Sequence, residues 1–272
     1  MKKVKLSQKL AESGLMLALA TILSVVAIAK LPYGGSITFA SMLPLIIVAY
    51  RYGFGWGLLA GATYGIIQML LGLDAVSYAT SAVAAIAIIM LDYVLAFATT
   101  SLSGLFNKRE NQAASLTYAA LLVCVMRYVF HVISGATVWA GLSIPTADAL
   151  IYSLIYNATY MLPETIITCG AAIYLGSTLN FRTPSLSMMK KSDTPKGVVA
   201  MTAVSGLLML ISAAAIVAMV FTKLQNPETG EFDITGISNV NLPVVGTIFG
   251  VALAAVLVMY FVSKSILKKQ AK

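Results

Sequence analysis

Long apolar segments follow one another along almost the whole chain, and they restrict its fold more than any other feature. A helix needs about 20 predominantly apolar residues to cross a bilayer. Unpaired backbone groups are costly in hydrocarbon, so only helices and closed barrels span a membrane. The segments lack the alternation over about ten residues that is typical of barrel strands. The sequence therefore predicts an all-α polytopic membrane protein.

Eight segments fit this description. Their approximate bounds are residues 10–30, 36–50, 54–73, 78–104, 113–138, 148–178, 198–222 and 242–263. Hydrophobic residues make up 59% of the chain and charged residues only 10%, against about 25% charged residues in soluble proteins. The only two cysteines, Cys124 and Cys169, fall inside such segments and are expected to be free thiols.

The basic residues test the count of eight, because Lys and Arg collect in cytoplasmic connections. Fifteen of the 18 fall before the first segment, after the last, or in every second connection: Lys2, Lys3, Lys5, Lys9, Arg51, Lys108, Arg109, Arg182, Lys190, Lys191, Lys196, Lys264, Lys268, Lys269 and Lys272. This distribution explains the net charge of +8 by membrane topology, with no nucleic-acid partner. It predicts a multi-pass protein of the plasma membrane with both termini in the cytoplasm.

A Ser-, Thr- and Lys-rich stretch after the sixth segment is typical of a solvated linker. We therefore expect three parts: a six-helix substrate-binding membrane domain over residues 1–182, a cytoplasmic linker over residues 183–197, and a two-helix C-terminal appendage over residues 198–272.

Small residues recur at helical spacing in two segments. Gly57, Gly61 and Gly65 share one helix face and are expected to let another helix of the same chain approach closely. Gly14 and Ala18 share a face of the first segment. That face suits either packing within the chain or docking of another subunit.

Ionisable side chains inside the segments cost about 2.5–3.5 kcal/mol each on insertion scales, so each is a candidate site residue. They are Asp92, Arg127, His131 and Glu164. The topology places Asp92 near the midplane, below His131 and Trp139. Tyr93, Tyr152, Tyr156, Asn157 and Tyr160 are the amphipathic candidates near them. A pocket that opens outward, with a carboxylate at its base and aromatic walls, suits a small cationic or amine-bearing solute.

Simpler roles remain open for some of these residues. Trp139 is equally suited to an interfacial anchor, and a single His131 to packing. Arg127 and Glu164 lie at similar depth and are expected to form a structural ion pair.

Several catalytic patterns are absent. The chain has no GxxxxGK[ST] phosphate loop, no GxSxG elbow and no convincing metal site. An intramembrane enzyme would depend on Asp92, His131 and Glu164 alone. We therefore expect a protein that is not an enzyme and needs no cofactor or metal.

Four motifs together resemble one known family. They are LDYVLAF at residues 91–97, RYVFHVISGATVW at 127–139, YSLIYNATYMLPE at 152–164, and the pattern from Glu12 to Ala18. Their order and spacing resemble the thiamine-specific substrate-binding subunit (S-component) of energy-coupling factor (ECF) transporters, over roughly residues 8–180. The two C-terminal helices have no counterpart in that six-helix fold.

The resemblance implies a high-affinity thiamine pocket near the outer face. Asp92 then corresponds to the acidic residue that bonds the pyrimidine amine, with Tyr93 beside it. His131 and Trp139 correspond to residues that pack against the rings of thiamine. Tyr152 and Asn157 correspond to polar contacts, and Tyr33 is the nearest substitute for a tryptophan that some members place over the ligand.

The resemblance also implies partners. Gly14 and Ala18 would dock on the transmembrane coupling subunit, which binds two ATPases that supply the energy for uptake. Three alternatives stay open: a thiamine precursor or another vitamin as ligand, a ligand-free membrane scaffold, and a secondary transporter driven by an ion gradient.

Overall fold

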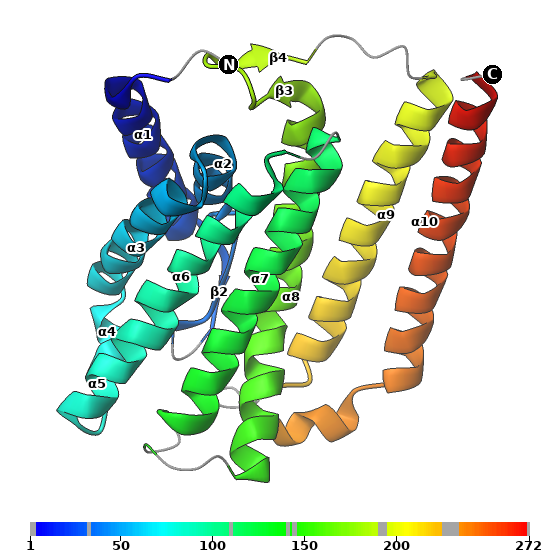
Figure 1. Cartoon of the computed structure of the whole chain (residues 1–272). Coiled ribbons are helices and arrows are strands. Elements are labelled where there is room, and N and C mark those ends of the chain that lie inside the picture. The colour runs from blue at the N-terminus through cyan, green and yellow to red at the C-terminus, as the bar shows by residue number, and fades with distance from the viewer. Residues whose placement is uncertain are drawn as a thin grey trace. The chain divides into compact units, whose positions relative to one another are not determined.

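The chain is almost wholly helical in a computed structural model that describes residues 4–31, 34–108, 111–139, 142, 146–189, 195–224 and 234–270 (Figure 1). It divides into two compact units, Met1–Met188 and Met189–Lys272. The predicted all-α class is confirmed, with small two-stranded additions.

The first unit contains six long helical segments among its described residues. The helices are α1 (Leu6–Val25), α2 (Leu43–Tyr52), α3 (Phe54–Leu71), the short α4 (Leu73–Ser77), α5 (Ala82–Ile88), η2 (Ile89–Leu95), α6 (Ala96–Ala98), η3 (Thr99–Phe106), α7 (Gln112–Thr137) and α8 (Ala147–Thr178). The elements from α5 to η3 follow one another without a break and form one helical segment. Helices α7 and α8 lie side by side (Figure 1).

Two predicted helical spans are partly wrong, because a β-hairpin lies between α1 and α2. Strands β1 (Ala27–Lys30) and β2 (Ser36–Thr38) pair antiparallel, where spans over residues 10–30 and 36–50 were expected. Gly34 has a φ of +94°, a conformation that L side chains rarely adopt. This glycine allows the chain to turn back before β2 begins.

Four helical segments are long and apolar enough to cross a membrane, among the residues described: α3, residues 82–106, α7 and α10 (Leu242–Gln270). Helix α2 is apolar but has only 10 residues, so it is about 15 Å long, half of a hydrocarbon core.

The glycines of α3 form a close-packed seam, as predicted. A Cβ atom at Gly61 would lie 2.5 Å from the carbonyl oxygen of Phe97, and one at Gly65 would lie 2.7 Å from that of Tyr93. Gly57 faces Ala49 of α2 in the same way. These contacts hold α3 against α2 and against the segment that carries Asp92.

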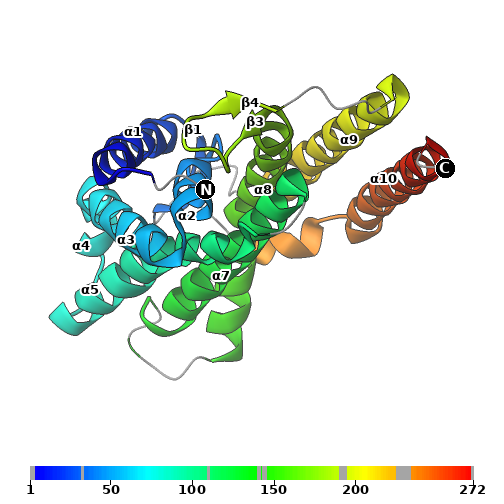
Figure 2. The same cartoon turned by 45° about the horizontal axis from the view of Figure 1, so that its top comes forward.

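Helix α1 lies beside α2 and α3 (Figure 2). It buries only Ser13 and Ala20, and hydrogen bonds from α3 attach it. The three bonds join Trp56 Nε1 to Ser13 Oγ (2.8 Å), Tyr64 Oη to the carbonyl of Ala20 (3.0 Å) and Gln68 Nε2 to Ser24 Oγ (2.8 Å). Gly14 and Ala18 are exposed, and nothing lies within 4 Å of a Cβ built at Gly14.

A polar cluster fixes the end of α1 to the segment after α8. Arg51 forms an ion pair of 3.0 Å with Glu12 and donates hydrogen bonds to the carbonyls of Phe181 (3.0 Å) and Pro184 (3.2 Å). These carbonyls lie next to the short pair of β3 (Leu179–Asn180) and β4 (Ser187–Met188).

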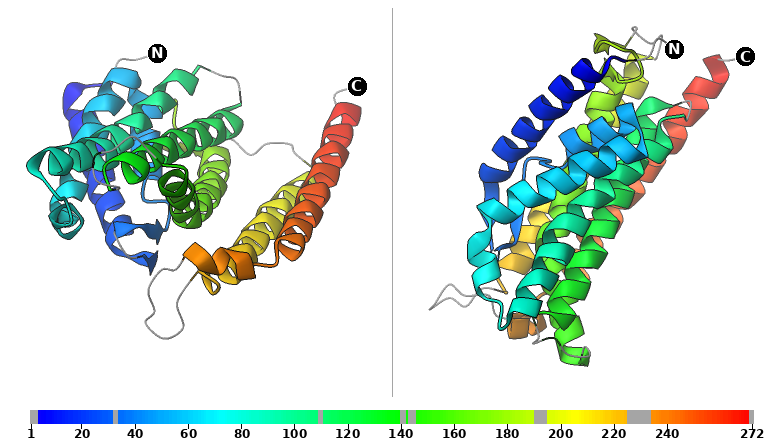
Figure 3. Two further views of the ribbon diagram at one scale, coloured as in Figure 1. Left: turned by 90° about the horizontal axis from the view of Figure 1, so that it is seen from below. Right: turned by 60° about the vertical axis from the view of Figure 1, so that its left-hand side comes forward.

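The second unit consists mainly of two helices, α9 (Lys196–Phe221) and α10, with a 3₁₀ turn, η4 (Ile234–Asn239), before α10. Figure 3 shows α9 and α10 side by side. Two sulfur contacts join the N-terminal part of α9 to the C-terminal part of α10: Ser263 donates to Met201 Sδ at 3.8 Å, and Ser205 donates to Met259 Sδ at 3.6 Å.

The α3 seam predicts the effect of a single added methyl group. We expect Gly61→Ala to lower the free energy of unfolding by about 1–3 kcal/mol, because the new Cβ overlaps the backbone of residues 97 and 98. Gly55→Ala on the same helix meets nothing within 4 Å and is the control. Thermal unfolding in detergent measures the stability of both variants. Equal midpoints would contradict the close packing of α3 at Gly61.

Candidate functional site

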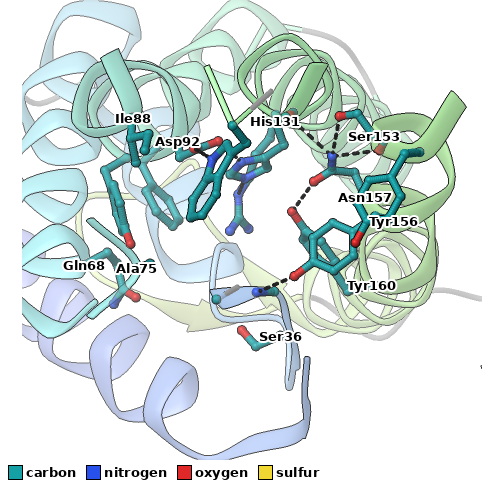
Figure 4. A pocket seen from close by; sticks show the side chains of 18 residues that line it. Ser36, Gln68, Ala75, Ile88, Asp92, His131, Ser153, Tyr156, Asn157 and Tyr160 are labelled. Atoms are coloured by element: carbon teal, nitrogen blue, oxygen red, sulfur yellow. Dashed lines mark hydrogen bonds and ion pairs between the residues drawn. The ribbon is translucent and has the colours of Figure 1, made fainter. Parts of the chain in front are cut away.

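A cavity of about 370 Å³ lies inside the first unit (Figure 4). Every major element of the bundle except α1 and α2 contributes to its wall. The lining residues are Gly34, Gly35, Ser36, Gln68, Ala75, Ile88, Asp92, Tyr93, Phe97, Arg127, His131, Gly135, Trp139, Tyr152, Ser153, Tyr156, Asn157 and Tyr160.

Asp92 is the centre of the hydrogen-bond network in this cavity. Its Oδ1 lies 2.7 Å from Nδ1 of His131. Its Oδ2 accepts hydrogen bonds from Ser134 Oγ at 2.6 Å and from Trp139 Nε1 at 3.2 Å. Three donors from α7 and its C-terminal end thus hold one carboxylate, which is the arrangement that stabilises a buried negative charge.

The backbone around Asp92 is a π-helix. Residues Ile89–Leu95 form η2, between α-helical turns on both sides. Such wide turns are rare in proteins as a whole, but those that occur are frequently at functional sites. Here the segment presents Asp92 to the cavity while the carbonyl of Tyr93 stays against Gly65 of α3.

Arg127 determines the proton position on His131. Its Nε donates to Nε2 of His131 at 3.1 Å. A guanidinium can only donate, so Nε2 must be the acceptor and the ring proton lies on Nδ1. His131 is therefore a neutral imidazole that donates to Asp92, and the order of donation is Arg127, His131, Asp92.

Aromatic side chains form much of the remaining wall. The rings of Tyr152 and Tyr156 stack at 6.2 Å with an interplanar angle of 7°. Tyr160 meets the ring of Tyr156 edge-on at 5.8 Å and that of His131 at 6.1 Å. Flat π faces beside a carboxylate favour a flat ligand that carries positive charge.

Asn157 connects α8 to α7 beside these rings. Its Nδ2 donates to the carbonyls of Ser153 (2.8 Å) and His131 (3.3 Å), while its Oδ1 accepts from Tyr160 Oη at 2.5 Å (Figure 4). A Cβ at Gly135 would collide with Oγ of Ser153, so glycine is required where the two helices meet. The network fixes the position of His131 through its backbone.

The predicted ion pair between Arg127 and Glu164 is wrong. Arg127 faces the cavity, where it bonds His131 and lies 4.5 Å from the ring centroid of Phe97. Glu164 instead accepts hydrogen bonds from the backbone N–H and the hydroxyl of Thr38, both at 2.6 Å. The two residues share a depth in the bundle but bond to different elements.

The cavity brings together nine of the residues singled out from the sequence: Asp92, Tyr93, Arg127, His131, Trp139, Tyr152, Tyr156, Asn157 and Tyr160. Tyr33 lies outside the described residues. The sequence reasoning missed Gln68, Ser134 and Ser153. Ser134 follows His131 by three positions and Ser153 precedes Asn157 by four, so helical periodicity could have found both. No group of three or more metal-ligating side chains occurs in the part of the chain that the structure describes.

Comparison with known proteins places the chain in a family. The family model "Thiamine transporter protein (Thia_YuaJ)" matches residues 10–182. The chain belongs to this thiamine transporter family. The thiamine transporter ThiT of Bacillus subtilis is 34% identical over 179 residues, which cover 61% of this chain and 88% of ThiT.

The fold agrees with the family. A solved structure of ThiT from Listeria monocytogenes matches with a TM-score of 0.50 and 25% identity, over 62% of this chain and 92% of that one. The family consists of transporters, in agreement with the prediction of a transport protein and not an enzyme. Together with its apolar helices, the family identifies the chain as a multi-pass membrane protein.

The Asp92 network predicts a cost for removing one donor. We expect Ser134→Ala to lower the free energy of unfolding by about 1–3 kcal/mol, because one bond to a partly buried carboxylate is lost. Thr137→Ala is the matched control on α7, since that hydroxyl bonds only the carbonyl of Ile133. The midpoint of thermal unfolding measures both variants. If it falls equally in the two, the bond from Ser134 to Asp92 makes no special contribution to stability.

Proposed function

We propose that the chain binds thiamine in this cavity and serves as the substrate-binding S-component for thiamine uptake. The observation that carries the proposal is the Asp92 carboxylate, held among aromatic rings in a cavity of about 370 Å³. That volume lies within the usual range of about 300–1,000 Å³ for small-molecule pockets. Membership of the thiamine transporter family supports the choice of ligand.

Each half of thiamine has a suitable partner. The amine of the pyrimidine ring would donate to Asp92, beside Tyr93, in a charge-assisted hydrogen bond. His131 and Trp139 would pack against the rings, and the positive thiazolium would lie against π faces. Arg127 and Asp92 carry opposite charges, and the neutral His131 adds none, so the charges of the ionisable side chains in the pocket sum to zero. A cationic ligand therefore meets no net positive charge there.

Polar contacts would complete the site. Tyr152 lines the cavity and can bond the ligand through its hydroxyl. Asn157 already bonds Tyr160 and the carbonyl of His131, so it contributes by exchanging a partner or by holding α7 in place. Tyr33, the residue before Gly34 in the sequence, is proposed as a contact with the ligand.

We further propose that transport depends on partner proteins. The exposed face of α1 with Gly14 and Ala18 would dock on an ECF coupling subunit, and two ATPases bound to that subunit would supply energy. The basic connections favour a plasma-membrane orientation with both termini cytoplasmic. The six-helix domain over residues 1–182 would bind thiamine, and the helices over residues 198–272 would form an appendage joined by the linker.

A fluorescence titration tests the ligand. The chain has two tryptophans, Trp56 and Trp139, of which only Trp139 lines the cavity. We expect saturable quenching by thiamine in the wild type and loss of the response in Trp139→Ala. Asp92→Asn should weaken affinity by about 10- to 100-fold, because a bond to a charged group contributes about 1.5–3 kcal/mol.

Asp148→Asn is the matched control, because Asp148 is exposed on α8 and does not line the cavity. It should bind thiamine like the wild type. If thiamine produces neither quenching nor a heat of binding in calorimetry with the wild type, the thiamine assignment is refuted and the alternative of a ligand-free membrane scaffold is favoured. Equal affinity for the isolated pyrimidine would favour a thiamine precursor as the ligand.

Uptake into proteoliposomes tests the partners. We expect accumulation of radiolabelled thiamine only with the coupling subunit, both ATPases and ATP. Gly14→Leu should abolish uptake and leave thiamine binding unchanged, whereas Gly170→Leu, another glycine with open space around it, should change neither. Accumulation by the chain alone under an ion gradient would identify a secondary transporter instead.

A further inference from the structure

Glu164 is a buried carboxylate outside the cavity wall. Its exposure is 1%, and it lies on α8 one turn beyond Tyr160. Both of its oxygens are used by one residue: Oε2 accepts the backbone N–H of Thr38, and Oε1 accepts the Thr38 hydroxyl, each at 2.6 Å. Thr38 is itself 5% exposed. The carboxylate thus holds the last residue of β2 through two hydrogen bonds.

The β-hairpin cannot fix its own position firmly. Its strands contain only four and three residues, and an isolated two-stranded ribbon is marginally stable at best. Its pairing is also irregular, with a shift of register between Ala27 and Ala29. The ladder between β1 and β2 therefore leaves the register of β2 weakly determined.

The register of β2 matters to the cavity. Side chains alternate along a strand, so Ser36 and Thr38 point to one side and Ile37 points to the other. Ser36 lines the cavity, while Ile37 is 6% exposed and does not. A slip by one residue would turn Ser36 away and bring Ile37 to the wall.

A second contact with α8 lies at the start of β2. The backbone N–H of Gly35 donates to Tyr156 Oη at 3.2 Å, and a Cβ at this glycine would lie 2.9 Å from the ring of Tyr160. Gly35 is bonded to Tyr156 and Thr38 to Glu164, so the strand follows α8 in the same direction. Gly35 contacts rings that themselves line the cavity, whereas Glu164 attaches β2 to α8 from outside the cavity wall.

We propose that Glu164 is a positioning residue for the thiamine pocket: by holding Thr38 through two hydrogen bonds, it sets the register of β2 and keeps Gly35 and Ser36 in the pocket wall. An apolar side chain could fill the same space without the cost of burying a carboxylate, but it would fix neither direction nor register. This inference rests on the proposed function and extends the binding machinery beyond the residues that face the ligand.

Two variants weaken the hydrogen bonding between Glu164 and Thr38 in different ways. Thr38→Val keeps the branched shape and the backbone N–H, but it removes the hydroxyl that donates to Oε1 of Glu164 and accepts from the backbone N–H of Ser41. Glu164→Gln keeps the shape and retains one acceptor oxygen. Thr38→Ser retains both bonds and is the conservative rescue. Thr168→Val is the matched control: Thr168 is buried on α8, one turn beyond Glu164, and its hydroxyl has no hydrogen-bond partner among the described residues.

The measurements are the dissociation constant for thiamine, from tryptophan fluorescence and calorimetry, and the thermal unfolding midpoint of each purified full-length variant. We expect Thr38→Val and Glu164→Gln to weaken thiamine binding by about tenfold or more in protein that is fully folded at the assay temperature. Thr38→Ser and Thr168→Val should stay within about twofold of the wild type.

The outcomes separate the two proposals. If Thr38→Val and Glu164→Gln unfold at lower temperature but bind thiamine with wild-type affinity, Glu164 is merely structural and the inference is refuted, while the proposed function stands. If Glu164→Gln does not fold, the milder Thr38→Val decides in the same way. If the wild type shows no saturable response to thiamine, the proposed function fails, and the inference fails with it.

Discussion

Carboxylates inside a membrane protein need donors, because hydrocarbon offers them no water. Two of them, the partly buried Asp92 and the buried Glu164, organise the interior of the first unit. Asp92 gathers His131, Ser134 and Trp139 from one helix and its end. Glu164 gathers the backbone and side chain of Thr38. These charge-assisted bonds join elements that form the cavity, in a setting where apolar contact has little driving force between helices in lipid.

Much of the fold could be predicted from apolar runs, and the seam at Gly57, Gly61 and Gly65 from spacing alone. The hairpin between α1 and α2 could not. Its residues are mostly apolar or small, and three or four such residues carry no periodicity that separates a strand from the end of a helix. The predicted segments place the reversal of the chain at residues 31–35, but only the structure shows that the residues on both sides of it pair as strands.

The site was predictable where residues of different helices lie at the same depth. His131 on α7, Trp139 just beyond its end, and Tyr152 and Asn157 on α8 were found in this way, and the family resemblance assigned their roles. The pairing of Arg127 with Glu164 failed because depth is only one coordinate. A residue's direction around the helix axis decides its partner, and that direction depends on packing which the sequence does not display. The bonds of Arg127 to His131 and of Glu164 to β2 follow from that second coordinate.

The π-helical turn of η2 makes the direction of the Asp92 carboxylate depend on the number of residues in this segment. Each residue of an α-helix turns the following part by about 100°. Removing one residue from the segment Ile89–Leu95 and restoring α-helical pitch would therefore rotate everything on one side of it. A homologue shorter by one residue here could keep the backbone against Gly65 or the carboxylate toward the cavity, but not both. In an alignment of sequences, a gap at this point would mark a change of ligand, although every neighbouring motif remained in place.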